Sequence, residues 1–160
     1  MARAWLSEWA PSEIKQRVKV LVSLGSPHNP PPSDSNFQKV DQTRGLLTYI
    51  NTKFPGAFEK SVKYVSVIGK SVSGSISLEQ RGEQLLAYGS YSVLCGDGNA
   101  KGDGIIPIPT AFLEGAKNIE VPEAKHSNFI PTPFKPSIFL KEATWYGSPE
   151  VLDQWVQEII

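Results

Sequence analysis

The sequence predicts an α/β fold, in which a mostly parallel sheet is flanked by helices. Short runs rich in β-branched residues have the length of buried strands, and they alternate with stretches in which apolar residues recur at helical spacing. The 13 glycines and 13 prolines indicate many turns and loops and argue against a helix bundle. A length of 160 residues suits one domain, so we expect residues 1–160 to form a single unit.

The expected elements of the first half begin with a helix over Ala2–Trp9, which Pro11 stops. A strand over Val18–Leu24 follows and is bounded by Gly25 and a proline-rich loop. Apolar residues near helical spacing predict a helix over about residues 37–54, capped by Asp34 or Ser35; they are Val40, Leu46, Leu47, Ile50 and Phe54.

The second half predicts a strand over Val62–Ile68, a loop over 70–77 and a helix over Leu78–Tyr91 with Leu85, Leu86 and Tyr88 inward. A third strand is expected over Asn118–Val121. The last helix starts near Ser148, its N-cap, and its expected inward stripe is Val151, Leu152, Trp155, Val156 and Ile159. Three strands are fewer than the five or six of an average sheet, so strands are missing from the pattern.

Composition argues against nucleic-acid binding, membrane association, disulfide bonding and a thiolate-rich zinc site. Sixteen basic and 16 acidic side chains give no net charge, which leaves no electrostatic footprint for nucleic acid or an anionic membrane. A single cysteine, Cys95, excludes an internal disulfide and a thiolate-rich zinc site. No apolar run approaches the roughly 20 residues of a membrane span, and no secretory signal is visible. We expect a soluble protein of the cytoplasm or a plastid rather than a secreted one, although the sequence itself leaves the compartment open.

The residues with chemical potential gather between Cys95 and Ser127. A glycine-rich loop holds Asp97 and Asp103, and His126 follows the third strand. A carboxylate and an imidazole on loops at the ends of neighbouring strands form the acid–base pair of many sheet enzymes, in which the acid fixes the tautomer of the histidine. The plainer alternative is that Asp-Gly pairs are turn residues and that the histidine is ordinary.

Other sites find less support. The Asp97–Asp103 segment lacks the terminal glutamate of a calcium loop, and two histidines without a His-x-x-x-His pair disfavour catalytic zinc. No phosphate-binding loop or dinucleotide fingerprint is present, so we expect no cofactor and no metal. The Gly-x-Ser-x-Gly motif that carries a nucleophilic serine in doubly wound hydrolases is also absent.

Several segments nevertheless resemble one family. Leu24-Gly25-Ser26-Pro27-His28 is similar to the Leu-Gly-Thr-Pro-His segment of α/β-hydrolase lipases, and Gly102-Asp103-Gly104-Ile105-Ile106-Pro107 to the segment that carries their catalytic acid. Leu113–Ile119, His126-Ser127 and Trp145–Pro149 resemble the lipase- and esterase-like α/β-hydrolases of cyanobacteria and plants, distantly akin to GPI inositol-deacylases.

This resemblance implies a serine-type carboxylic ester hydrolase that acts on a small-molecule or lipid-like ester. Asp103 then matches the acid of the catalytic triad and His126 its base, with Asp97 as the fallback acid, whereas His28 matches a histidine near the site that is structural. Aromatic and apolar residues of Phe129–Phe134 and Phe139-Leu140 would cover an acyl pocket or simply pack.

The resemblance also implies that the 160 residues are the C-terminal portion of the fold. The first strands and the turn with the nucleophilic serine would lie upstream of Met1, and the chain alone would be inactive. The strand at Val18–Leu24 would then expose an edge able to pair with another chain. The alternative is a non-catalytic α/β protein or partner subunit without a nucleophile, or an unrelated α/β binding domain.

Overall fold

Three parallel strands form the centre of the structure, which is a computed structural model describing residues 2–32, 41, 43–77, 82–130, 138–139 and 143–160. The strands are β1 (Val20–Leu24), β2 (Lys63–Gly69) and β5 (Lys117–Val121), in the order β1-β2-β5. Leu24 pairs with Val67, and Gly69 pairs with Val121. The predicted α/β class with a parallel sheet is therefore confirmed, and the strands lie within two residues of their predicted bounds.

The central strand β2 is buried on both faces, as a parallel strand between two helical layers should be. Its apolar residues belong to separate clusters on the two faces. Val65 and Val67 pack with Val121 and Val151 on one face, whereas Tyr64 packs with Leu6 on the other.

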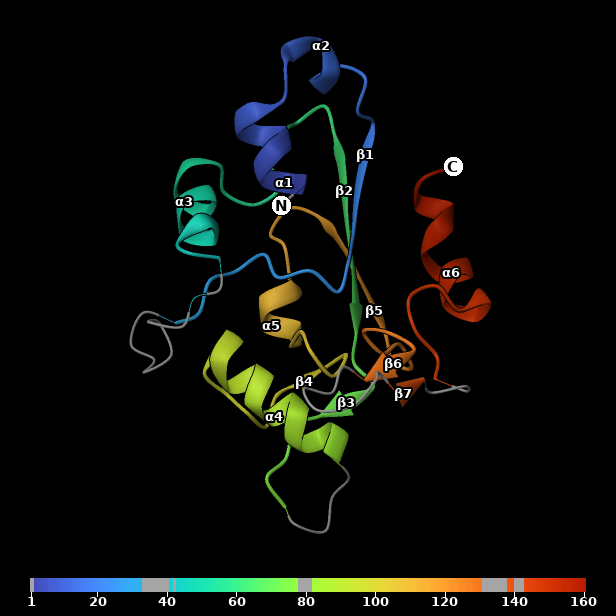
Figure 1. The fold of residues 1–160 in the computed structure, drawn as a ribbon. Helices are drawn as coiled ribbons and strands as arrows, with labels where there is room; N and C mark the ends of the chain where they lie inside the picture. Colours follow the sequence, from blue (N-terminus) through green and yellow to red (C-terminus); the bar gives the residue numbers. More distant parts are fainter. Residues whose placement is uncertain (1, 33–40, 42, 78–81, 131–137, 140–142) are drawn as a thin grey trace.

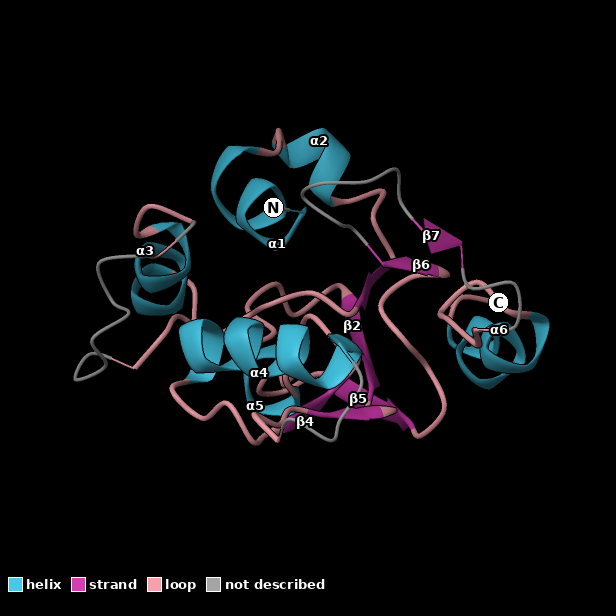
Figure 2. Ribbon diagram, turned by 60° about the horizontal axis from the view of Figure 1, so that its bottom comes forward, coloured by secondary structure: helices cyan, strands magenta, loops and turns pink. Residues whose placement is uncertain are grey.

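Helices cover both faces of the sheet (Figure 1, Figure 2). One side holds α1 (Ala2–Ala4) with a following π-helical turn (Trp5–Trp9), α3 (Leu46–Lys53), α4 (Gly82–Cys95) and α5 (Ile108–Ala111). The other side holds α6 (Pro149–Trp155), which a 3-10 turn over Val156–Glu158 continues. A short α2 (Ser12–Lys15) begins directly after Pro11, the residue expected to stop the first helix.

The helix expected over residues 37–54 is much shorter. Arg44 and Gly45 both adopt left-handed backbone, with φ of 52° and 83°, and α3 begins only after them. The carboxylate of Asp41 accepts hydrogen bonds from the backbone N–H groups of Thr43 and Gly45 and so closes this turn. The predicted caps Asp34 and Ser35, together with Val40, lie outside the described residues.

The inward face predicted for α4 is wrong at both leucines, whereas the third predicted residue, Tyr88, is half-buried. Leu85 and Leu86 are 58% and 47% exposed, whereas Ala87 and Tyr91, one turn apart, are fully buried. The reason is the partner of α4: it packs on β3 (Val72–Ser73) rather than on the wide sheet, and small Ala87 permits the close approach. Residues 78–81, where the helix was expected to start, lie outside the described residues.

The stripe predicted for the last helix is correct only in part. Val151 is fully buried and Trp155 packs beside it, but Leu152 and Ile159 are 36% and 46% exposed. The change from α to 3-10 geometry after Trp155 rotates Ile159 off the inward line. Ser148 occupies the N-cap position as predicted, yet its hydroxyl accepts the N–H of Trp145 and caps no helical N–H.

Two small antiparallel ribbons were not foreseen. Within the loop expected over 70–77, β3 pairs with β4 (Lys101–Gly102) and so brings the glycine-rich segment to the sheet. The second ribbon joins β6 (Phe129–Ile130) to β7 (Ile138–Phe139). The remaining residues expected to cover an acyl pocket, 131–134 and Leu140, lie outside the described residues. None of the described helices has the length and apolar character needed to cross a membrane.

Candidate functional site

The carboxyl ends of the three parallel strands meet at one edge of the sheet, which is where α/β proteins place their ligands. β1 runs into Gly25, β2 ends at Gly69, and the loop after β5 leads through Ala124 to His126. The ribbon of β3 and β4 delivers Asp103 to the same edge, directly after Gly102.

Asp103 is held rigidly at this position. Its side chain is fully buried. The backbone N–H groups of Ile105 and Ile106 donate to Oδ1 over 3.0 and 2.7 Å, so the acid caps its own turn. The Tyr146 hydroxyl donates to Oδ2 over 2.8 Å. A buried carboxylate needs such donors, since an unpaired one would carry a large desolvation cost.

Two glycines make room for this carboxylate. Gly25 has a φ of 48°, and a Cβ at this position would overlap Asp103 Oδ2 and lie 2.7 Å from the Tyr146 hydroxyl. A Cβ at Gly69 would lie 2.8 Å from Asp103 Cβ. Only glycine fits at both strand ends, because each backbone passes directly against the acid.

His126 lies against the same carboxylate. Its Nδ1 is 2.9 Å from Asp103 Oδ2, and its backbone N–H donates to the carbonyl oxygen of Asp103 over 2.8 Å. A carboxylate only accepts, so Nδ1 carries the proton and Nε2 is left as the basic nitrogen. The His126 side chain is 37% exposed, whereas the acid behind it is not exposed at all. The pair therefore presents one oriented imidazole face outward, an arrangement suited to proton transfer.

Asp97 has a different environment. It is exposed, and its carboxylate accepts the N–H of Asn99 over 2.9 Å in the turn that follows α4. Of the two acids in the glycine-rich loop, Asp103 is the one hydrogen-bonded to His126.

Two tyrosines that sequence reasoning missed complete the surroundings of the acid. Tyr146 contacts the carboxylate itself, and the Tyr91 hydroxyl accepts the N–H of Gly104 over 2.8 Å and donates to Val72 O over 3.3 Å. Burial raises the pKa of both phenols, and the negative charge of Asp103 raises it further. Both hydroxyls thus stay protonated and able to donate. In the sequence, the only signal for Tyr146 was the resemblance of the Trp145–Pro149 segment to a known family, and no pattern indicated a role for Tyr91.

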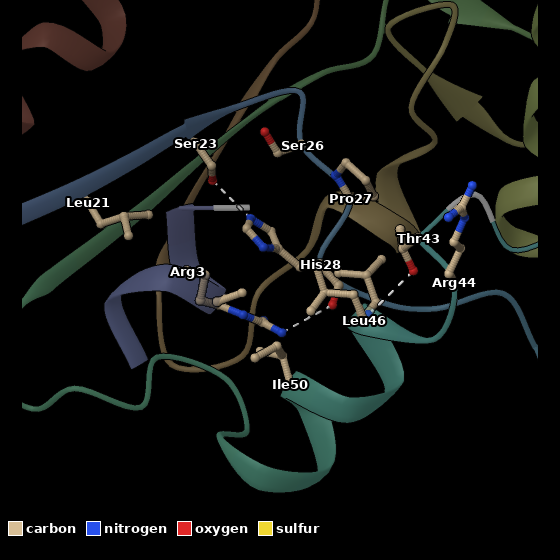
Figure 3. A pocket seen from close by; sticks show the side chains of 12 residues that line it. Arg3, Leu21, Ser23, Ser26, Pro27, His28, Thr43, Arg44, Leu46 and Ile50 are labelled. Atoms are coloured by element: carbon tan, nitrogen blue, oxygen red, sulfur yellow. Dashed lines mark hydrogen bonds between the residues drawn. The ribbon is translucent and has the colours of Figure 1, made fainter. Parts of the chain in front are cut away.

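The second histidine, His28, is buried beside β1 (Figure 3). Its Nε2 is 2.9 Å from Ser23 Oγ, whose hydroxyl donates to Val65 O over 3.3 Å. With the serine proton already used, His28 acts as the donor to Ser23. Burial, and next the charge of Arg3, lowers the pKa of His28 to about 4, so its ring is neutral.

A cavity of about 560 Å³ opens next to this histidine, between α1, the loop after β1 and α3 (Figure 3). Apolar side chains form much of its wall; they include Leu21, Leu46, Leu47 and Ile50. The polar part comes from Ser23, Ser26, His28, Arg44 and the nearly buried Arg3. The Arg3 guanidinium donates to the side-chain oxygen of Asn51 and to the carbonyl oxygen of His28.

In the described part of the chain, no three His, Cys, Asp or Glu side chains converge as metal ligands. Comparison of the sequence and structure with protein-family models, curated proteins and solved structures gave no match. The geometry around Asp103 and His126 is therefore the feature of the molecule that points to a function.

Proposed function

We propose that this chain carries the acid and the base of a serine-type carboxylic ester hydrolase of the lipase and esterase kind. The observation that supports this most directly is the hydrogen bond between the buried Asp103 carboxylate and the half-buried His126 imidazole. The nucleophilic serine is assigned to a segment that is not among these 160 residues, because no Gly-x-Ser-x-Gly turn occurs in them.

In this proposal His126 Nε2 accepts the proton of the serine as its oxygen attacks the ester carbonyl. Asp103 keeps Nδ1 protonated and stabilises the imidazolium that forms. His126 then returns the proton to the leaving alcohol. Water repeats the cycle on the acyl-enzyme, which releases the carboxylic acid.

Ser23 and His28 are a poorer nucleophile–base pair, although they are equally close. The Ser23 hydroxyl already donates to Val65 O, and the low pKa of His28 makes this imidazole a weak base. No described carboxylate orients His28 in the way that Asp103 orients His126. We regard His28 as a structural residue.

The free edge of β1 supports a place for the missing nucleophile. Among the described strands β1 pairs only with β2, so its other edge can take the strand that leads into the nucleophile turn. The cavity is lined in part by Leu21 and Ser23 of β1 and is of a size typical for small-molecule ligands. An ester with an apolar acyl chain is the substrate class that best suits these walls.

The test uses the reading frame extended upstream of Met1 through an encoded Gly-x-Ser-x-Gly, assayed on p-nitrophenyl esters of increasing acyl length. We expect Asp103→Asn and His126→Gln each to lower kcat by about 10³- to 10⁴-fold. Asp97→Asn is the matched control and should retain turnover. Loss of turnover in the Asp97 variant alone would move the acid to that residue, and an upstream stop codon would remove the proposed nucleophile.

A non-catalytic partner subunit is the second candidate, and the same free edge of β1 favours it. Such a subunit would bind a strand of another chain without hydrolysing esters. In this case the Asp103 and His126 variants would leave binding unchanged, whereas variants of the β1 edge would abolish it.

A further inference from the structure

Tyr146 lies at the point where three segments of the chain meet. Its hydroxyl donates to Asp103 Oδ2 and accepts the backbone N–H of Gly69, each over 2.8 Å. The side chain is only 3% exposed, and its ring stands edge-on to the His126 ring, with centroids 6.4 Å apart.

We propose that Tyr146 is a positioning residue, whose hydroxyl keeps Asp103 Oδ2 directed at His126 Nδ1 and thereby fixes the tautomer of His126. This role contributes to catalysis only if the proposed ester hydrolase is correct, whereas the effect of Tyr146 on the His126 tautomer does not depend on that proposal. Oδ1 is held by the backbone N–H groups of Ile105 and Ile106, whereas the partners of Oδ2 are two side chains, Tyr146 and His126.

The backbone holds Tyr146 in place independently of the acid. The N–H of Lys125 donates to Thr144 O over 2.9 Å, which ties the segment before Tyr146 to the residue before His126. The Trp155 indole N–H donates to the carbonyl oxygen of Tyr146 over 3.3 Å. The position of the hydroxyl therefore does not depend on the acid, and burial keeps the hydroxyl protonated by raising the pKa of the phenol.

Removal of the hydroxyl has a specific consequence at Gly69. This buried N–H would lose its acceptor. Gly69 packs against both the Ala124 carbonyl oxygen, which already accepts the Ser71 hydroxyl, and the acid, so Asp103 can replace the lost acceptor. An unpaired buried N–H is costly, so the carboxylate should turn toward Gly69. The bond to His126 Nδ1 would weaken as a result.

The experiment is ¹⁵N and ¹H NMR of the imidazoles in the 160-residue chain and its Tyr146→Phe variant. The chain has two histidines, so both rings can be followed. We expect His126 to be in the Nδ1–H form with a slowly exchanging proton in the parent chain. In Tyr146→Phe that proton should exchange at least about tenfold faster, and the Nε2–H form should appear.

Two controls separate positioning from a loss of packing. Tyr64 is likewise 3% exposed, but its hydroxyl accepts the backbone N–H of Glu59 and does not contact the acid. Tyr64→Phe should therefore leave the tautomer and proton exchange of His126 unchanged. His28 is the internal reference, because Ser23 holds its Nε2 and the substitution should not affect its signals. Exchange at His126 within twofold of the parent in Tyr146→Phe would overturn the proposal.

If Tyr146→Phe does not fold, 3,5-difluorotyrosine at position 146 provides the second test. The fluorinated phenol is a stronger donor to Oδ2, so it should draw electron density from the bond to His126 and move the Nδ1 proton upfield. An unmoved resonance would contradict the proposal. The proposed function and the positioning role can fail separately. An unchanged kcat in the Asp103→Asn variant of the extended protein would contradict the proposed function. An unchanged His126 tautomer in the Tyr146 variants would contradict only the positioning role.

Discussion

At the scale of single residues, the two histidines have opposite surroundings. His126 lies half-exposed against a carboxylate, whereas His28 is buried near the guanidinium of Arg3. Burial and, next, the like charge of Arg3 lower the pKa of His28 and so disfavour its protonated imidazole. In the sequence each histidine follows a strand by a few residues, so only the family resemblance separated them, because the neighbours of both rings come from distant segments.

We expect the stability of the fold to depend on pH through His28. Its pKa is about 4 in the folded chain and about 6.5 when unfolded, so below pH 6.5 the unfolded state binds the proton more readily. Stability from the neutral His28 is thus complete above pH 6.5 and is lost as the pH falls toward 4, by about 3 kcal/mol at most. Urea unfolding between pH 7.5 and 4 measures the effect.

His28→Gln is the matched variant for this measurement, because its amide can still donate to Ser23 Oγ but does not titrate. The difference in unfolding free energy between parent and variant should shrink as the pH falls from 7 to 4. If the unfolding free energies of the two proteins changed with pH in parallel, the pH dependence would not come from His28.

At the scale of elements, hydrophobic periodicity located the strands better than the helices. A buried parallel strand is a mostly apolar run, so β2 was visible from its residues, whereas the partly exposed β5 was marked by the alternation of Ile119 and Val121 with polar residues. A helix needs a known partner surface before its inward face can be assigned. Helix α4 packs through Ala87 and Tyr91 on a two-residue strand whose pairing joins positions about 30 residues apart, and no local pattern encodes that contact.

Tyr91 links α4 to the loop of the acid, and Tyr91→Phe tests this link. The substitution keeps the ring but leaves the buried N–H of Gly104 without its acceptor, so we expect a loss of about 1–3 kcal/mol of unfolding free energy. Tyr49→Phe, at a residue that is 44% exposed, should change stability by less than about 0.5 kcal/mol. Equal midpoints of urea unfolding for the two variants would mean that the link carries no stability.

At the scale of the whole molecule, the candidate site is assembled from five separate stretches of chain: Gly25, Gly69, His126, Tyr146 and the loop at Asp103. Strand order explains why some of this could be predicted. Carboxyl ends of parallel strands share one edge, so an acid and a histidine in loops near those ends can meet. The contact of Tyr146 with an acid 43 residues away depends on how the C-terminal segment returns to the sheet, and spacing along the sequence says nothing of that path.

The free edge of β1 leads to a prediction about assembly. Gly25 N–H donates to Val67 O, and Lys19 O accepts from Lys63, so the odd-numbered residues of this strand bond to β2. The alternation of a strand then directs the N–H and C=O of Val20 and Val22 away from β2, whereas the carbonyl oxygen of Leu24 accepts the Ser26 hydroxyl over 3.3 Å. An unpaired edge of this kind binds another strand, and we expect the 160-residue chain to associate as its concentration rises.

Val22→Pro should abolish this association, because proline removes an outward N–H without breaking a bond to β2. Val22 also packs against the cluster beneath α6, so Val22→Ala is the matched control: it loses similar packing but keeps the N–H. Sedimentation velocity over a range of concentrations should show a monomer for Val22→Pro and association for Val22→Ala and the parent. If both variants associate as the parent does, the chains associate through contacts elsewhere, and the edge of β1 does not bind a strand of another chain.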